Sequence, residues 1–111
     1  MHLRVVRVTI APGKTEAYWA WSAEILKLWD EAGVVRAGGP YATKGPSGED
    51  VGVWLTVHES EEQARKQFQG LYEAGRGKEL IALRPPLVAE TTGGSFAPWD
   101  GAGSAPLAPS W

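Results

Sequence analysis

The chain has 111 residues, a formal net charge of −2 and no cysteine. This length fits one domain, the small net charge does not favour nucleic acid or an anionic membrane as a partner, and the lack of thiols excludes disulfides and cysteine chemistry. No apolar run is long enough to cross a bilayer, so we expect a globular cytoplasmic protein.

The first half of the chain has strand, helix and strand patterns in turn. Residues 2–10 are β-branched and alternating, which predicts a strand. Residues 14–33 predict a long helix that ends at Gly33. The apolar arc of this helix is wide, so we expect it to contact more than its own sheet. Residues 34–43 predict a second strand, which the Gly-Gly-Pro sequence at 38–40 places at a sheet edge.

The second half repeats the strand and helix patterns. Residues 44–50 have the composition of a hairpin loop, and the alternating sequence 51–58 predicts a third strand. Ser60 and Gln63 match a capping box that begins a second helix. A short helical turn and a fourth strand, at residues 87–92, complete the pattern.

The predicted order of elements is β-α-β-β-α-β. This order is that of the ferredoxin-like α+β fold, with a four-stranded antiparallel sheet and both helices on one face. The other face would expose an apolar patch to water, so we expect something to cover it. We assign the domain to residues 1–94 and treat residues 95–111, rich in proline and glycine, as an extended C-terminal strap with four anchors: Phe96, Trp99, Leu107 and Trp111.

The order of elements, the sequence APGK that leads into the first helix, and VWLTVHESEEQARKQF from strand to capped helix resemble the dimeric α/β-barrel superfamily. Within it, the chain is most similar to NIPSNAP-like proteins and antibiotic-biosynthesis-type monooxygenases. The resemblance covers residues 2 to about 92. It implies a homodimer in which two sheets pair face to face. It also implies a small cavity between each subunit's sheet and helices, or at the ends of the barrel.

Candidate site residues follow from the alternation of the third strand. If Val51, Val53 and Leu55 lie under the helices, then Trp54, Thr56 and His58 lie on the bare face. We expect Arg7 from the first strand on the same face, and hairpin pairing to bring Arg36 near His58. A slip of one residue in register would exchange the two faces.

Each candidate has a functional and a structural interpretation. His58 is a candidate proton carrier, or it ends a strand and bonds a neighbouring polar group. Arg7 and Arg36 could neutralise an enolate or carboxylate, or pair with an acid across an interface, with Glu90 as a possible partner for such an arginine. Trp54 and Thr56 could shape a substrate pocket, although Trp54 also suits a dimer core. Tyr18 could bind substrate, but it lies in the apolar stripe of its helix.

These features leave two classes of function open. The first is a cofactor-independent oxygenase-like enzyme acting on a small aromatic or polyketide-like substrate. The second is a non-catalytic ligand-binding or stress-related dimeric module. Only two histidines and no cysteines are present, so we expect no metal and no cofactor. The chain has no asparagine, a residue that usually belongs to the active site of the resembled oxygenases.

Overall fold

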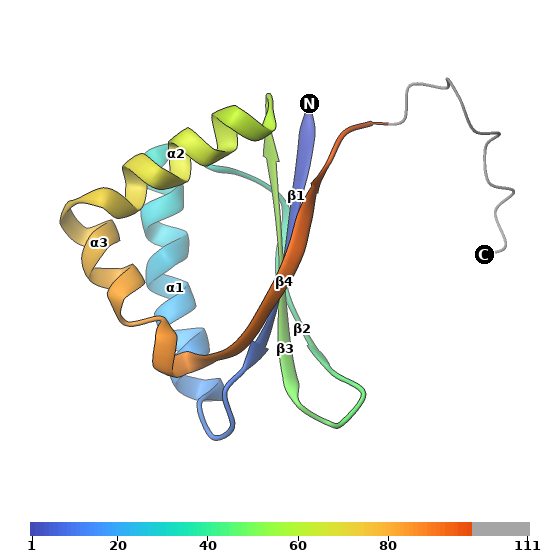
Figure 1. Ribbon diagram of the computed structural model, residues 1–111. Coiled ribbons are helices and arrows are strands. Elements are labelled where there is room, and N and C mark those ends of the chain that lie inside the picture. The colour runs from blue at the N-terminus through green and yellow to red at the C-terminus, as the bar shows by residue number, and fades with distance from the viewer. Residues whose placement is uncertain (99–111) are drawn as a thin grey trace, which may run out of the picture.

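The computed structural model describes residues 1–98, which form one sheet with helices on a single face (Figure 1). The strands pair antiparallel in the order β2-β3-β1-β4, so β1 and β3 are central. This arrangement is the predicted α+β ferredoxin-like fold. The elements in chain order are β1 (His2–Ile10), α1 (Thr15–Ala32), β2 (Val35–Lys44), β3 (Asp50–His58), α2 (Glu61–Glu73), α3 (Gly75–Ala82), η1 (Pro85–Leu87) and β4 (Val88–Phe96).

α1 ends and α2 begins where the sequence predicted, whereas α3 is longer than the predicted helical turn. Gly33 follows α1 in the left-handed conformation, with a φ of 76°, which glycine adopts without steric cost. The Ser60 side chain accepts a hydrogen bond from the Gln63 backbone N–H at 3.0 Å and so caps α2. The wide apolar face of α1 packs on the sheet and also on α3, where the Trp21 indole N–H donates to the Leu80 carbonyl at 2.8 Å.

The predicted irregular edge strand is confirmed in β2. Its register with β3 shifts between Arg36 and Gly38 and again between Gly38 and Tyr41. These shifts fall at the Gly-Gly-Pro segment, as expected of a bulged edge strand.

The last strand is longer than the sequence predicted. β4 continues to Phe96 because residues 93–96 still pair with β1, through Gly93 opposite Val6 and Phe96 opposite Leu3. The predicted strap from residue 95 therefore begins inside the strand. Its other proposed anchors, Trp99, Leu107 and Trp111, lie outside the described residues.

The strand register decides which side chains face the helices. In β1, Val8 and Ile10 are core residues and Val6 packs against that core, so Arg7 lies on the opposite, open face as expected. In β3 the expectation is wrong: Trp54 lies opposite Val6, and Trp54 belongs to the core beneath the helices. Thr56 and His58 share the inward face of β3, so the bare-face site predicted for these three residues does not form. Residues directly opposite each other in an antiparallel pair share a face.

The outward face of the sheet is largely apolar and is not covered by the helices (Figure 1). Val53 and Leu55, which were expected inside, lie on this open face with Val57 and are half-buried, while the remaining member of the expected set, Val51, is buried. Val35, Tyr41 and Phe96 share the open face by register and expose more than half of their surface. None of the helices in residues 1–98 is long and apolar enough to cross a membrane.

Candidate functional site

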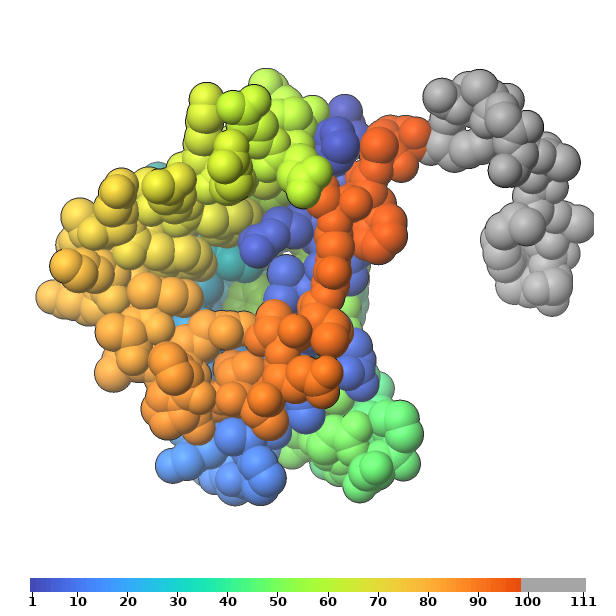
Figure 2. All heavy atoms as spheres, viewed as in Figure 1, coloured from blue at the N-terminus to red at the C-terminus, as the bar shows by residue number. Residues whose placement is uncertain are grey.

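A cavity of about 1500 Å³ lies between the sheet and the helices. Figure 2 shows the hollow between the helical layer and β4, with β1 visible at its base. Its walls come from β1, α1, β3, α2 and β4, and from the segment that joins α3 to β4. This is one of the two positions that the family resemblance implied for a cavity.

Aromatic side chains form much of the cavity wall. Trp29 and Trp54 meet edge to face, with ring centroids 5.1 Å apart, and Phe68 and Tyr72 are stacked at 6.1 Å. Such a surface suits a flat, apolar ligand, which can stack on the rings or meet their edges. The aromatic residues that line the cavity are Tyr18, Trp21, Trp29, Trp54, Phe68 and Tyr72.

Two indole–phenol hydrogen bonds fix the polar atoms of these rings. The Trp54 indole N–H donates to the Tyr18 hydroxyl and the Trp29 indole N–H donates to the Tyr72 hydroxyl, each at 2.8 Å. Burial raises the pKa of both Tyr18 and Tyr72, which keeps the two phenols protonated. Because each hydroxyl oxygen accepts from an indole, its own proton can be donated to another acceptor.

Arg4 places a positive charge on the wall of this aromatic cavity. Its guanidinium carbon lies 4.5 Å from the centroid of the Phe68 ring, in a cation–π contact. Burial lowers the pKa of Arg4, and the charge of Arg84 lowers it further, while Tyr72 opposes the change. An arginine stays protonated under such conditions. Within residues 1–98, Arg4 has no acidic side chain as an ion-pair partner.

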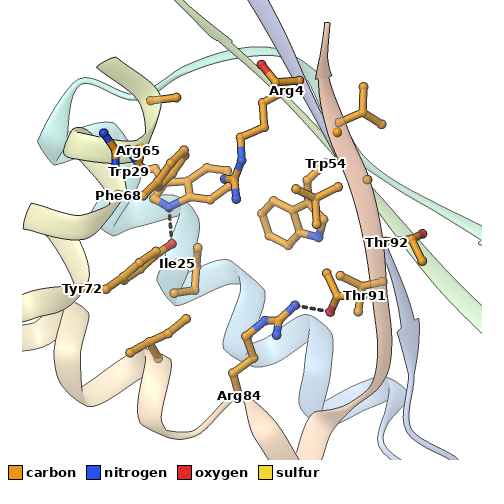
Figure 3. A pocket seen from close by; sticks show the side chains of 18 of the residues that line it. Arg4, Ile25, Trp29, Trp54, Arg65, Phe68, Tyr72, Arg84, Thr91 and Thr92 are labelled. Carbon is orange, nitrogen blue, oxygen red and sulfur yellow. Dashed lines mark hydrogen bonds between the residues drawn. The ribbon is translucent and has the colours of Figure 1, made fainter. Parts of the chain in front are cut away.

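Arg84 brings a second guanidinium into the same cavity. It lies between α3 and η1, and its Nη2 donates to the Thr91 hydroxyl of β4 at 2.7 Å. In Figure 3 the side chains of Arg4 and Arg84 enter the cavity from opposite ends, with Trp54 and Tyr72 between them. The inner cavity is therefore both aromatic and positively charged.

His58 does not belong to the residues that line the cavity. Only 5% of it is exposed, its Nε2 is 2.8 Å from the Thr56 hydroxyl, and its ring packs edge-on against Phe68. Burial lowers the pKa of His58 and the charge of Arg4 adds to this effect, while Gln63 and Gln67 oppose it. These contacts fit the structural interpretation of His58. The imidazole on the cavity wall is instead that of His2.

Arg7 and Arg36 also lie away from the cavity. Arg7 pairs with Val53 and with Thr92 in the register of the sheet, which places it on the open face. Arg36 lies opposite Thr56, and its guanidinium is 3.5 Å from the Asp30 carboxylate of α1. Arg7 is therefore separated from Trp54 and His58 by the sheet, whereas Arg36 shares the face of Thr56, so the predicted cluster of all four residues does not form. The individual catalytic roles of His58, Arg7 and Arg36 remain predictions.

Of the predicted substrate-binding residues, Trp54 and Tyr18 line the cavity and Thr56 does not. The sequence reasoning missed Arg4, Arg84 and Tyr72. A signal for Arg4 was present, because a strand that turns Val6 and Val8 inward also turns Arg4 inward. No comparable signal identified Arg84, which reaches the cavity only through the turn before β4. Across residues 1–98, no group of three or more histidine, aspartate or glutamate side chains is arranged to hold a metal ion.

The fold is similar to that of solved structures, although no protein-family model and no curated protein matches the sequence. An uncharacterised NIPSNAP-domain protein from Burkholderia xenovorans superposes with a TM-score of 0.71 at 13% identity, over 94% of this chain and 100% of that one. A NIPSNAP-family protein from Agrobacterium tumefaciens gives 0.69 at 19% identity, over 89% and 86%.

A candidate antibiotic biosynthesis monooxygenase from Nitrosomonas europaea gives a TM-score of 0.60 at 15% identity, over 88% of this chain and 98% of that one. Identities this low establish a shared fold and nothing finer. The expected resemblance to NIPSNAP-like and monooxygenase-like proteins is confirmed at that level.

Proposed function

We propose that this protein is a homodimer in which each subunit binds a small aromatic or polyketide-like molecule between its sheet and helices, and acts on it as a cofactor-independent oxygenase-like enzyme. The observation that carries the proposal is the aromatic cavity with Arg4 in its wall. Pockets of this kind, apolar with a few polar groups directed inward, are typical of small-molecule sites.

The chemistry that the cavity can support is stabilisation of an ionised enol or phenol. The charge of Arg4 favours the anionic form of a bound acid in surroundings where water screens little. The Tyr72 hydroxyl, which interacts electrostatically with Arg4, can donate to the same anion, since it retains its own proton. The anion of an enol or phenol is more electron-rich than its neutral form, and therefore reacts more readily with oxygen. His2 is the histidine of the cavity wall, and its imidazole offers both a hydrogen-bond donor and an acceptor to a ligand.

The second candidate function is non-catalytic binding of the same kind of molecule. It is favoured by the position of His58, which is buried against Phe68 and Thr56 and so does not meet a ligand in the cavity. A binding module needs the aromatic wall and the positive charge, but no proton carrier.

The homodimer is proposed from the open face of the sheet. Val53, Leu55 and Phe96 leave apolar surface there without cover, and a two-fold pairing of sheets would bury it. Arg7 and Glu90 lie on the same face, because Arg7 pairs with Thr92 and Thr9 pairs with Glu90. Neither forms an ion pair within residues 1–98, so Arg7 of one copy can meet Glu90 of the other.

An oxygen-uptake assay with hydroxylated naphthoic acids tests the enzymatic proposal. We expect the wild-type protein to accelerate oxygen consumption without added metal or cofactor, and Trp54→Ala and His2→Gln to lose most of this activity. Arg76→Gln, on the exposed surface of α3, is the control and should keep it. Binding without turnover would favour the non-catalytic module, and a failure of every compound to bind would refute both functions.

A further inference from the structure

Three arginines line the cavity: Arg65 is exposed on α2, whereas Arg4 and Arg84 are half-buried and lack a counter-ion within residues 1–98. Arg4 and Arg84 both act electrostatically on Tyr72, and Arg84 also acts on Arg4, so the three groups belong to one local field. Within the described residues neither guanidinium is in an ion pair. Like charges near each other in surroundings of low polarity repel, and a bound anion would relieve that repulsion.

The geometry of Arg4 leaves its hydrogen-bond donors free for such an anion. The guanidinium carbon lies over the Phe68 ring, 4.5 Å from its centroid. Within residues 1–98, no side-chain hydrogen bond and no ion pair uses the N–H groups of Arg4. Figure 3 shows the Arg4 side chain directed into the cavity, between Trp29 and Trp54. A guanidinium with unused N–H donors can bind a carboxylate through two of them.

Arg84 is oriented by a different contact. Its bond to the Thr91 hydroxyl uses Nη2 and holds the side chain against β4, at the far end of the cavity from Arg4. One end of a ligand can therefore reach Arg4, while its ring lies among Trp29, Trp54 and Tyr72 and its other end approaches Arg84.

We propose that the ligand of this cavity is an aromatic carboxylate: a planar ring system that packs among the tryptophans, with an acidic group bound by Arg4 and a second electron-rich oxygen, such as a phenolic hydroxyl, facing Arg84. The inference rests on the proposed function, since it specifies the class of molecule that the same cavity takes. Glu61 and Glu62 lie at the rim on α2, where they are exposed.

The test compares one acid with its neutral analogue. Calorimetric titration of the wild-type protein with 1-hydroxy-2-naphthoate, and with 1-hydroxy-2-naphthamide, presents the same ring with and without charge. We expect the acid to bind at least tenfold more tightly, because a charge-assisted hydrogen bond is lost in the amide. Added salt should weaken binding of the acid and leave that of the amide unchanged.

Substitutions test which residue supplies the positive charge that binds the acid. Arg4→Gln and Arg4→Met should each weaken binding of the acid by about tenfold to a hundredfold and leave binding of the amide nearly unchanged. Arg76→Gln removes the same charge from the exposed surface of α3 and should change neither affinity. Circular dichroism of each variant verifies that the fold is retained, and Arg84→Gln serves as the second site if an Arg4 variant does not fold.

The outcomes separate this inference from the function on which it rests. Equal affinity of acid and amide, with both bound, would leave an aromatic-binding cavity and overturn the anionic ligand. Failure of both compounds to bind would overturn the proposed function together with the inference. Inorganic phosphate that displaces the naphthoate at a similar concentration would show that the arginines recognise small anions in general, and would also overturn the aromatic carboxylate.

Discussion

Arg4 occupies an inward position of β1, a face otherwise lined at Val6, Val8 and Ile10 by apolar side chains of the core. A charge at such a position costs free energy unless it is paired or bound, and within residues 1–98 its partner is the Phe68 ring rather than an acidic side chain. Strand alternation alone is enough to predict from the sequence that Arg4 points inward. The contact between Arg84 and Thr91 could not be predicted in the same way, because it depends on how the chain turns between α3 and β4.

His58 provides a prediction at the same scale. Burial lowers its pKa in the folded protein, whereas in the unfolded chain the pKa is close to its ordinary value of about 6.5. Below that pH the unfolded chain binds a proton that the folded protein resists. The free energy of unfolding should therefore decrease as the pH falls from about 7.5 to about 5.5, and should be unaffected by His58 at higher pH.

Urea denaturation across this pH range measures the effect of His58. His58→Gln should flatten the dependence on pH, and His2→Gln should retain most of it. An equally steep decrease in wild type and His58→Gln would contradict the assignment of a neutral, buried imidazole.

Helices and strands were predicted more reliably than the faces they present. Gly33, the Ser60 cap and the Gly-Gly-Pro segment each impose a local backbone geometry, and each element end that depends on them is where the sequence placed it. The orientation that we predicted for β3 was wrong because each of its two faces carries side chains that can be buried. Alternation separates Val53 and Leu55 from Trp54, but does not say which set meets the helices. Gly52 offered a clue, since it leaves room for Trp19 of α1.

Packing between α2 and α3 gives a prediction at the scale of elements. A Cβ added to Gly77 would lie 1.8 Å from the Leu71 carbonyl oxygen, so alanine there requires the two helices to separate. Gly77→Ala should lower the free energy of unfolding by about 1–3 kcal/mol. Gly70→Ala is the matched control: it lies in α2 with nothing within 4 Å of the added Cβ, and should be neutral or slightly stabilising.

Thermal denaturation of both glycine variants measures the difference. If Gly77→Ala is as stable as Gly70→Ala, the close approach of α3 to the end of α2 is not as the structure describes it.

The molecule as a whole has two largely apolar surfaces, one on each side of the sheet. The inner face of the sheet and the helices enclose the aromatic cavity, while the outer face is open and carries Arg7 and Glu90 among apolar side chains. The sequence predicted that one face would need a partner, because an antiparallel sheet with helices on one side must leave the other exposed. It could not tell which residues of β3 lie there, so the site was assigned to the wrong face.

Sedimentation and light scattering test the proposed pairing of two copies. At micromolar concentration the wild-type protein should have the mass of a dimer, and Arg7→Glu should weaken association by placing like charges across the interface. The combined Arg7→Glu and Glu90→Arg variant should restore it, and Arg76→Glu on α3 should have no effect. A monomer mass for the wild-type protein would contradict the pairing of the open faces.

The most direct measurement of where the ligand binds is a nuclear magnetic resonance titration of ¹⁵N-labelled protein with 1-hydroxy-2-naphthoate. Binding in the cavity predicts that the indole N–H signals of Trp29 and Trp54 shift together with the side-chain signal of Arg4, while the backbone amides of Val53 and Val57 on the open face stay in place. Shifts confined to the open face, with both indole signals unchanged, would contradict the account.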